Sequence, residues 1–168
     1  MNIVLIGYRG VGKTTVGRLL AKKMKRPFVD TDSEVERIAK MNVQKIVSDF
    51  GWKAFRKKES EVARVLLKNK NTVMSTGGGT FTENMIRIDK RKNIVVLLTA
   101  DIQKISSRIR GTKRPSITGK GASDEIADVL KKRERKYVAR ADVVIDTSQV
   151  SQAKVASMII EYVGRMKL

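Results

Sequence analysis

The 168-residue chain is expected to fold as an α/β protein in which helices cover both faces of a central, five-stranded parallel sheet. Two observations predict this class. Short β-rich runs alternate with longer stretches of helical period, and the apolar runs are continuous, which is typical of strands buried on both faces of a parallel sheet. Because no linker, internal repeat or low-complexity segment divides the chain, we expect one domain, residues 1–168.

Five short runs predict the strands, and a helical stretch follows each of them except the third, which is stopped by a glycine segment. The runs are residues 3–6, 28–29, 72–75, 94–98 and 143–145. In the first helix, Val16, Leu20 and Met24 fall on one face at helical spacing. Ser33 and Glu36 predict a capping box at the start of the second helix. The last helix carries a single apolar stripe, made of Val155, Met158, Ile159, Tyr162, Val163 and Met166.

The composition excludes several kinds of chemistry. The chain has no cysteine and no histidine, so a disulfide framework, a thiolate nucleophile, a Cys/His zinc site and an imidazole base are all absent. Any general base is therefore expected to be a carboxylate. The net charge of +19 indicates anionic partners, and three interpretations stay open: a solvated lysine-rich surface, nucleic-acid binding, or attraction of a small charged substrate such as a nucleotide.

No segment is expected to span a membrane. The longest apolar runs, residues 3–6 and 94–98, are far shorter than the ~18 residues that a transmembrane helix needs. The first of them leads directly into a glycine-rich motif, which is not typical of a signal peptide. We therefore expect a cytoplasmic protein.

The strongest motif runs from Gly7 to Thr14, GYRGVGKT, and fits the phosphate-binding pattern G-x-x-x-x-G-K-[ST] between a strand and a helix. Gly10 and Gly12 permit the backbone angles that turn successive N–H groups towards phosphate oxygens. Lys13 is expected to reach the β- and γ-phosphates, and the Thr14 hydroxyl to ligate Mg²⁺. The motif predicts ATP binding, while Arg9 within it is assigned no role.

Two clusters could receive the phosphoryl acceptor. Asp30 and Asp32 follow the second strand and are expected to point the same way in an extended segment, one towards Mg²⁺ and one towards a substrate hydroxyl. The alternative is that both simply precede a helix, where Asp is favoured. Arg56 and Glu59 are three residues apart on a helix, so they could form a pair that holds the guanidinium for an anionic group, or an ordinary surface pair.

Three further features lie later in the chain. Gly77, Gly78 and Gly79 end the third strand and suggest close approach of a ligand to the backbone. Arg114 lies in a glycine-flanked segment, residues 111–122, that is expected to be a mobile loop closing over the transferring phosphates. Arg133 and Tyr137 are four residues apart on the penultimate helix.

Taken together, these motifs resemble those of the shikimate kinase family over nearly the whole chain. The shared residues are Gly7 to Ala21 of the first motif, Phe28-x-Asp30-x-Asp32, Phe55-Arg56-x-x-Glu59, Gly77 to Gly79, Arg114-Pro115, Arg133-x-x-x-Tyr137 and Asp146-Thr147. The phosphate loop is generic, but this ordered set is specific. The resemblance implies a monomeric kinase of the P-loop, nucleoside-monophosphate-kinase-like fold, in the route to chorismate and aromatic amino acids.

The resemblance also implies a set of roles. The enzyme would transfer the γ-phosphoryl group of ATP to the 3-hydroxyl of shikimate. Asp32 would bind shikimate hydroxyls and act as base within an acceptor region at residues 32–60, and Asp30 would support Mg²⁺ through water. The implied catalytic residues are Lys13, Asp32 and Arg114. The implied nucleotide contacts are Gly10, Val11, Gly12, Lys13, Thr14, Thr15, Arg108 and Arg114. The implied acceptor contacts are Asp32, Arg56, Gly77, Gly78, Gly79 and Arg133.

The chain departs from the family pattern at a few positions. The segment after Arg114-Pro115 has Ser116-Ile117 where Leu-Leu is usual, Trp52 stands where Glu is expected, and no arginine follows Thr147. Two other functions are the alternatives to this one. A related kinase, such as a gluconate kinase, could use the same loop and aspartates. Nucleic-acid binding is not expected, because only 5% of the residues are aromatic and no RNA-binding motif occurs.

Overall fold

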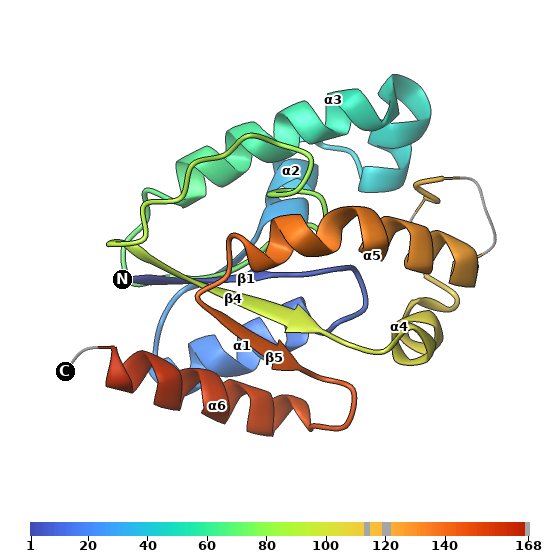
Figure 1. Cartoon of the computed structure of the whole chain (residues 1–168). Coiled ribbons are helices and arrows are strands. Elements are labelled where there is room, and N and C mark those ends of the chain that lie inside the picture. The colour runs from blue at the N-terminus through green and yellow to red at the C-terminus, as the bar shows by residue number, and fades with distance from the viewer. Residues whose placement is uncertain (113–114, 119–121, 167–168) are drawn as a thin grey trace.

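A computed structural model describes residues 1–112, 115–118 and 122–166 and places a single parallel sheet at the centre (Figure 1). The strands are β1 (Asn2–Ile6), β2 (Phe28–Asp30), β3 (Val73–Ser75), β4 (Asn93–Thr99) and β5 (Val143–Asp146). They lie in the order β2-β3-β1-β4-β5, and every neighbouring pair is parallel. The predicted five-stranded parallel sheet is therefore confirmed.

Helices cover both faces of this sheet. They are α1 (Lys13–Met24), α2 (Thr31–Ala39), α3 (Val43–Leu66), α4 (Ile102–Ile109), α5 (Ala122–Val138) and α6 (Gln152–Arg165). In Figure 1, α1 and α6 lie against one face of the sheet, while α2, α3 and α5 lie over the other. This three-layer arrangement is the predicted α/β/α architecture. None of the helices within the described ranges is both long and apolar enough to cross a membrane.

The alternation of side chains along β1 divides the core in two. Ile3 and Leu5 pack with α1 and α6 in the larger core, whereas Val4 and Ile6 pack on the opposite face with α3 and α5. All four side chains are buried. A strand with both faces covered must be apolar at every position, which is why this run lacks the alternation of a half-exposed strand.

Two local expectations were wrong. Helix α2 is capped by Asp30, whose carboxylate accepts from the amides of Asp32 and Ser33, so the helix begins before Ser33 and no capping box forms there. Met158 of α6 and Met166, which follows the last residue of α6, are 38% and 53% exposed, although the stripe predicted both as buried. They flank the stripe that packs on the sheet, and the buried residues of α6 are Val155, Ala156, Ile159 and Val163.

The carboxyl ends of the strands converge on one edge of the sheet, where an open α/β fold presents its ligand sites. The glycine-rich loop follows β1, α2 follows β2, and Gly77 to Gly79 follow β3. At the end of β5, the Thr147 hydroxyl donates to the backbone oxygen of Val11, 3.0 Å away. The sequence motifs therefore meet at a single edge.

Candidate active site

The loop between β1 and α1 has the geometry of a phosphate cradle. Gly7, Gly10 and Gly12 have φ angles of 134°, 84° and 99°, which L side chains rarely adopt. A Cβ on Gly7 would also lie 2.2 Å from the backbone oxygen of Leu98. Gly12 begins α1 without a side-chain cap, so the first amides of this helix and its dipole remain available for an anion.

Lys13 is buried at the base of this loop. Its Nζ donates to the backbone oxygens of Gly7 and Tyr8, each 2.8 Å away. The ammonium group is thus held beside the cavity that the loop surrounds. That cavity has an empty volume of about 1090 Å³ and contains most of the predicted nucleotide contacts. Its lining includes Gly10, Gly12, Lys13, Thr14, Thr15, Asp30, Asp32 and Arg108.

Arg108 and Val11 take different places around the loop. The Arg108 guanidinium donates to the backbone oxygen of Gly10 at 3.2 Å and to that of Thr147 at 3.0 Å, which ties α4 to the glycine-rich loop and to the end of β5. Val11 is buried and does not line the cavity with its side chain. The predicted nucleotide residue Arg114 lies outside the described residues.

Three side-chain oxygens meet beside the N-terminus of α1. The Thr14 hydroxyl donates to Oδ2 of Asp30 at 2.9 Å and lies 3.3 Å from the Ser75 hydroxyl. Mg²⁺ prefers hard oxygen ligands of this kind and usually completes its shell with water and phosphate oxygens. The donor set therefore fits a nucleotide-bound Mg²⁺. Ser75 was missed at the sequence level because nothing in its spacing links the end of β3 to the glycine-rich loop.

Asp30 and Asp32 do not share an extended segment, contrary to expectation. Asp30 ends β2 and caps α2, whereas Asp32 lies within the first turn of the helix. The cause is the Asp30 carboxylate, which accepts from two backbone amides and so starts the helix one residue after the strand. The two carboxylates consequently separate, Asp30 towards Thr14 and Asp32 into a second cavity.

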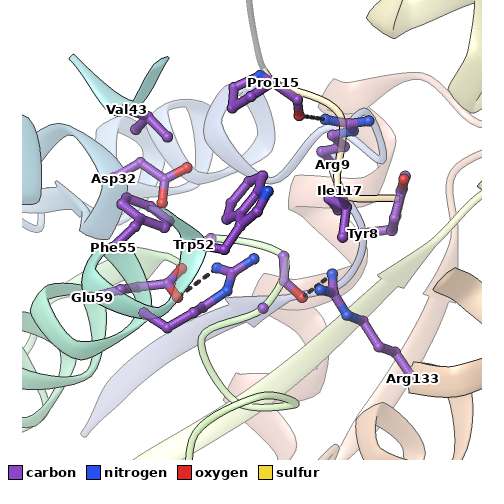
Figure 2. A pocket seen from close by; sticks show the side chains of 14 residues that line it. Tyr8, Arg9, Asp32, Val43, Trp52, Phe55, Glu59, Pro115, Ile117 and Arg133 are labelled. Atoms are coloured by element: carbon purple, nitrogen blue, oxygen red, sulfur yellow. Dashed lines mark hydrogen bonds and ion pairs between the residues drawn. The ribbon is translucent and has the colours of Figure 1, made fainter. Parts of the chain in front are cut away.

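This second cavity brings together the predicted acceptor residues (Figure 2). Its lining comprises Tyr8, Arg9, Asp32, Val43, Trp52, Phe55, Arg56, Glu59, Gly77, Gly78, Gly79, Pro115, Ile117 and Arg133. Every predicted acceptor contact is therefore present in one cavity, although these residues span a hundred positions of the chain.

Arg56 is fixed by a buried partner and not by a surface pair. Its guanidinium donates to Glu59 at 2.7 Å, and the Glu59 side chain is fully buried. Thr80 also donates to this carboxylate, at 2.7 Å. Burial raises the pKa of Glu59, while the attraction of Arg56 opposes that rise. The guanidinium also lies 5.0 Å from the ring centre of Trp52 and 5.3 Å from that of Phe55, so three contacts hold it at the cavity wall.

The glycine segment after β3 is glycine for steric reasons. A Cβ on Gly77 would lie 2.1 Å from Glu59 Oε1 and 2.5 Å from Asp32 Oδ1. A Cβ on Gly79 would lie 2.3 Å from the Arg56 Cζ. Both positions thus leave room for the charged groups of the cavity to approach the backbone.

Arg133 and Tyr137 anchor the other side of this glycine segment. Arg133 is 4% exposed, and it donates to Glu83 at 2.8 Å and to the backbone oxygen of Gly78 at 3.3 Å. The Tyr137 hydroxyl donates to the same oxygen, and burial raises its pKa to about 12, so it stays protonated. A second buried guanidinium therefore faces the cavity across from Arg56.

The sequence patterns assigned no role to several residues that line the cavities. Arg9 lines both cavities, and Trp52, Pro115 and Ile117 line the smaller one. Trp52 is the only tryptophan of the chain, and in the sequence it is marked only by its departure from the family pattern. No spacing rule links it to residues 115–117, more than sixty positions away, so only the fold could show that they meet.

The two cavities share part of their walls. Arg9, Asp32, Gly77 and Gly78 line both. The larger cavity offers a phosphate cradle, Lys13 and the side-chain oxygens that suit Mg²⁺. The smaller cavity offers the guanidinium groups of Arg56 and Arg133 for an anion and the carboxylate of Asp32 for hydroxyls. This juxtaposition suits transfer of a phosphoryl group from a nucleotide to a hydroxyl of a small anionic acceptor, a reaction that depends on alignment and charge stabilisation.

Comparison with known proteins points in the same direction. The family model described as shikimate kinase matches residues 9–164. Shikimate kinase 2 of Pectobacterium atrosepticum is 37% identical over 94% of this chain and 93% of its own length. Shikimate kinase of Thermodesulfovibrio yellowstonii is 38% identical over 98% and 96%. Among solved structures, shikimate kinase from Acinetobacter baumannii in complex with shikimate has a TM-score of 0.90 and 32% identity, covering 99% of this chain and 94% of that one.

Proposed function

The chain belongs to the shikimate kinase family, and we propose that its two adjoining cavities hold ATP and shikimate on either side of Asp32. It is an ATP-dependent kinase that transfers the γ-phosphoryl group to the 3-hydroxyl of shikimate, giving shikimate 3-phosphate and ADP. The observation that carries the proposed arrangement is the wall shared by the two cavities, which contains Asp32.

The nucleotide is bound by the glycine-rich loop and the start of α1. Backbone amides from Gly10 to Thr15 would donate hydrogen bonds to the phosphate oxygens, and Lys13 would turn from the carbonyls of Gly7 and Tyr8 to the β- and γ-phosphates. Arg108, beside Gly10 and Thr147, would border the adenine. Arg114, outside the described residues, is proposed to contribute positive charge to the transferring group.

Mg²⁺ would be held by Thr14 directly and by Asp30 through water. When bound with ATP, the ion supplies charge stabilisation to the phosphates. The Thr14 hydroxyl and the Asp30 carboxylate, 2.9 Å apart, orient each other at the edge of the nucleotide cavity.

Replacing Thr14 by valine tests this role, because valine keeps the shape and removes the hydroxyl. We expect the Mg²⁺ concentration for half-maximal rate to rise by about tenfold or more, as is usual for groups that hold or orient a metal. A Mg²⁺ titration at saturating ATP and shikimate measures the change. A chelator should abolish turnover of the unmodified enzyme, and re-added Mg²⁺ should restore it. An unchanged Mg²⁺ requirement in Thr14→Val would remove Thr14 from the metal site.

Shikimate would lie in the smaller cavity with its carboxylate between Arg56 and Arg133. Both guanidinium groups are largely buried and each already has a carboxylate partner, so they can receive an anion without large rearrangement. The backbone of Gly77 to Gly79 would border the ring. Asp32 would accept hydrogen bonds from the ring hydroxyls, and it would take the proton of the 3-hydroxyl as the new phosphate ester forms.

Gly79→Ala probes the close approach of Arg56 to the backbone. The new methyl group would displace the guanidinium, which can move because it is the end of a flexible side chain. We expect the KM for shikimate to rise by about tenfold, the effect of one lost charged hydrogen bond, with the KM for ATP unchanged. Gly164→Ala on α6, where a Cβ meets nothing within 4 Å, is the matched control and should leave both constants unchanged. An unaltered KM for shikimate in Gly79→Ala would contradict the assignment.

The segment around Pro115 is also proposed to exclude water from the acceptor cavity. Pro115 and Ile117 line the acceptor cavity, and their segment is proposed to cover bound shikimate. A covered cavity leaves the shikimate hydroxyl as the available acceptor and so suppresses ATP hydrolysis. We assign residues 111–122, of which 113–114 and 119–121 lie outside the described residues, as the lid, and residues 32–60 as the acceptor-binding region of one kinase domain, residues 1–168. We further propose that the enzyme is a monomer and acts in the cytoplasm, where ATP is available.

An assay of ADP release across a panel of acceptors tests the proposed function. With Mg-ATP, we expect turnover with shikimate and none above background with gluconate or nucleoside monophosphates. Turnover with gluconate alone would favour the related sugar-acid kinases. Binding of RNA or DNA at physiological salt, combined with no turnover of any acceptor, would instead assign the +19 charge to nucleic acid.

A further inference from the structure

Glu125 is a buried carboxylate that no sequence motif singled out. It lies in the first turn of α5, and its side chain is 1% exposed. One oxygen, Oε1, pairs with Arg9. The other, Oε2, accepts from the Ser116 hydroxyl and from the amides of Ile117 at 2.8 Å and Thr118 at 3.0 Å. The carboxylate thus joins the glycine-rich loop to residues 115–118.

These partners form one wall of the acceptor cavity. Arg9, Pro115 and Ile117 line it, and Arg9 donates to the backbone oxygen of Pro115 at 2.9 Å (Figure 2). Glu125 does not line either cavity. Its contacts therefore reach the site only through other residues.

The same segment reaches across to the opposite wall. The Trp52 indole N–H donates to the backbone oxygen of Ser116 at 3.1 Å. The Trp52 ring in turn lies 5.0 Å from the Arg56 guanidinium. A continuous path of contacts thus leads from Glu125 through Ser116 and Trp52 to a proposed shikimate ligand.

Electrostatics favour an ionised Glu125 at the centre of this path. Burial opposes its ionisation. However, the hydrogen bonds from Ser116, Thr118 and Ile117, together with the charge of Arg9, outweigh burial and hold the pKa of Glu125 below its usual range. Hydrogen bonds to a charged acceptor are stronger than neutral ones, so one ionised carboxylate can fix two segments at once.

We propose that Glu125 is a positioning residue for the acceptor, holding Arg9 and residues 115–118 together as one wall of the shikimate cavity without touching either substrate. The inference rests on the proposed function, because it takes this cavity as the shikimate site. Without the carboxylate, Arg9 would lose its counter-ion and the amides of Ile117 and Thr118 their acceptor.

Glu125→Gln tests the proposal, because it keeps the volume and removes the charge. We expect the KM for shikimate to rise by about tenfold or more while the KM for ATP changes by less than about twofold. Asp124→Asn is the matched control, since it removes an exposed charge from the same helical turn and should leave both constants unchanged. Ser116→Ala, which removes one of the hydrogen bonds, should shift the shikimate KM in the same direction by a smaller factor.

Trp52 supplies a readout that does not depend on activity. It is the only tryptophan, and it contacts Ser116, so its emission reports on the placement of residues 115–118. In the enzyme without substrates, Glu125→Gln should shift the emission maximum, and Asp124→Asn should not. The proposal would be overturned if Glu125→Gln changed neither the emission maximum nor the KM for shikimate. It would also be overturned if the KM values for shikimate and ATP rose in parallel while Tm fell, because that result indicates a structural role. If the unmodified enzyme did not turn over shikimate, the proposed function would fail instead.

Discussion

Asp32→Asn should lower kcat for shikimate phosphorylation by about a hundredfold to ten-thousandfold, the usual contribution of a positioned general base. Asparagine has nearly the same shape and can still hydrogen-bond a hydroxyl, but it cannot take the proton. We therefore expect the KM for shikimate to change much less than kcat. Histidine and cysteine are absent from the chain, so no imidazole or thiolate can replace the lost carboxylate.

Single-turnover and steady-state rates at saturating ATP and shikimate measure this effect. Glu34→Gln is a suitable control, because it removes a carboxylate from the same helix at a position that pairs only with the exposed Arg37 among the described residues. A variant Asp32→Asn that retained more than about a tenth of the original kcat would show that Asp32 is not the base. The role would then reduce to hydrogen bonding of the acceptor.

Arg56→Ala should raise the KM for shikimate by about thirtyfold or more and leave the KM for ATP within about twofold. Truncating one member of a buried, hydrogen-bonded charge pair costs about 2–5 kcal/mol, and every 1.4 kcal/mol corresponds to a factor of ten. Part of this loss comes from Glu59, which is fully buried and would lose its cationic partner. The nucleotide cavity does not include Arg56, so ATP binding should be preserved.

Separate titrations of the two substrates, with Tm as a check on folding, distinguish the outcomes. Lys57→Ala, an exposed neighbour on the same helix, removes the same charge and should change neither KM. Equal losses of shikimate and ATP binding in Arg56→Ala would mean that the residue supports the fold or the nucleotide and not the acceptor.

Much of the site could be predicted because local patterns encode it. The buried run Ile3 to Ile6 followed by Gly7 to Thr14 fixes a strand, a phosphate loop and a helix within a short segment. The Arg56–Glu59 pair follows from helical spacing alone, and the structure confirms it at 2.7 Å. Spacing could not predict that this pair is buried, because its burial depends on the packing of Gly77 to Gly79 against it.

Predictions are wrong or missing where two local preferences compete, or where residues in contact are far apart in the sequence. At the start of α2, both Asp30 and Ser33 could cap the helix. Asp30 is the residue that does so, because its carboxylate accepts from the amides of Asp32 and Ser33, and the helix therefore begins earlier than a capping box at Ser33 would allow. Glu125 contacts Arg9, and Trp52 contacts Ser116. The residues of each pair are far apart in the sequence, and no recognisable motif links them. Such contacts follow from the arrangement of α3 and α5 over the sheet, which no sequence pattern determines.

A crystal structure with ADP, Mg²⁺ and shikimate bound tests the central claim most directly, because the claim is one of placement. We expect the shikimate carboxylate between Arg56 and Arg133, its 3-hydroxyl within hydrogen-bond distance of Asp32 and facing the β-phosphate of ADP, and Mg²⁺ beside Thr14. Shikimate bound outside this cavity, or bound within it with its carboxylate turned away from both arginines, would contradict the account.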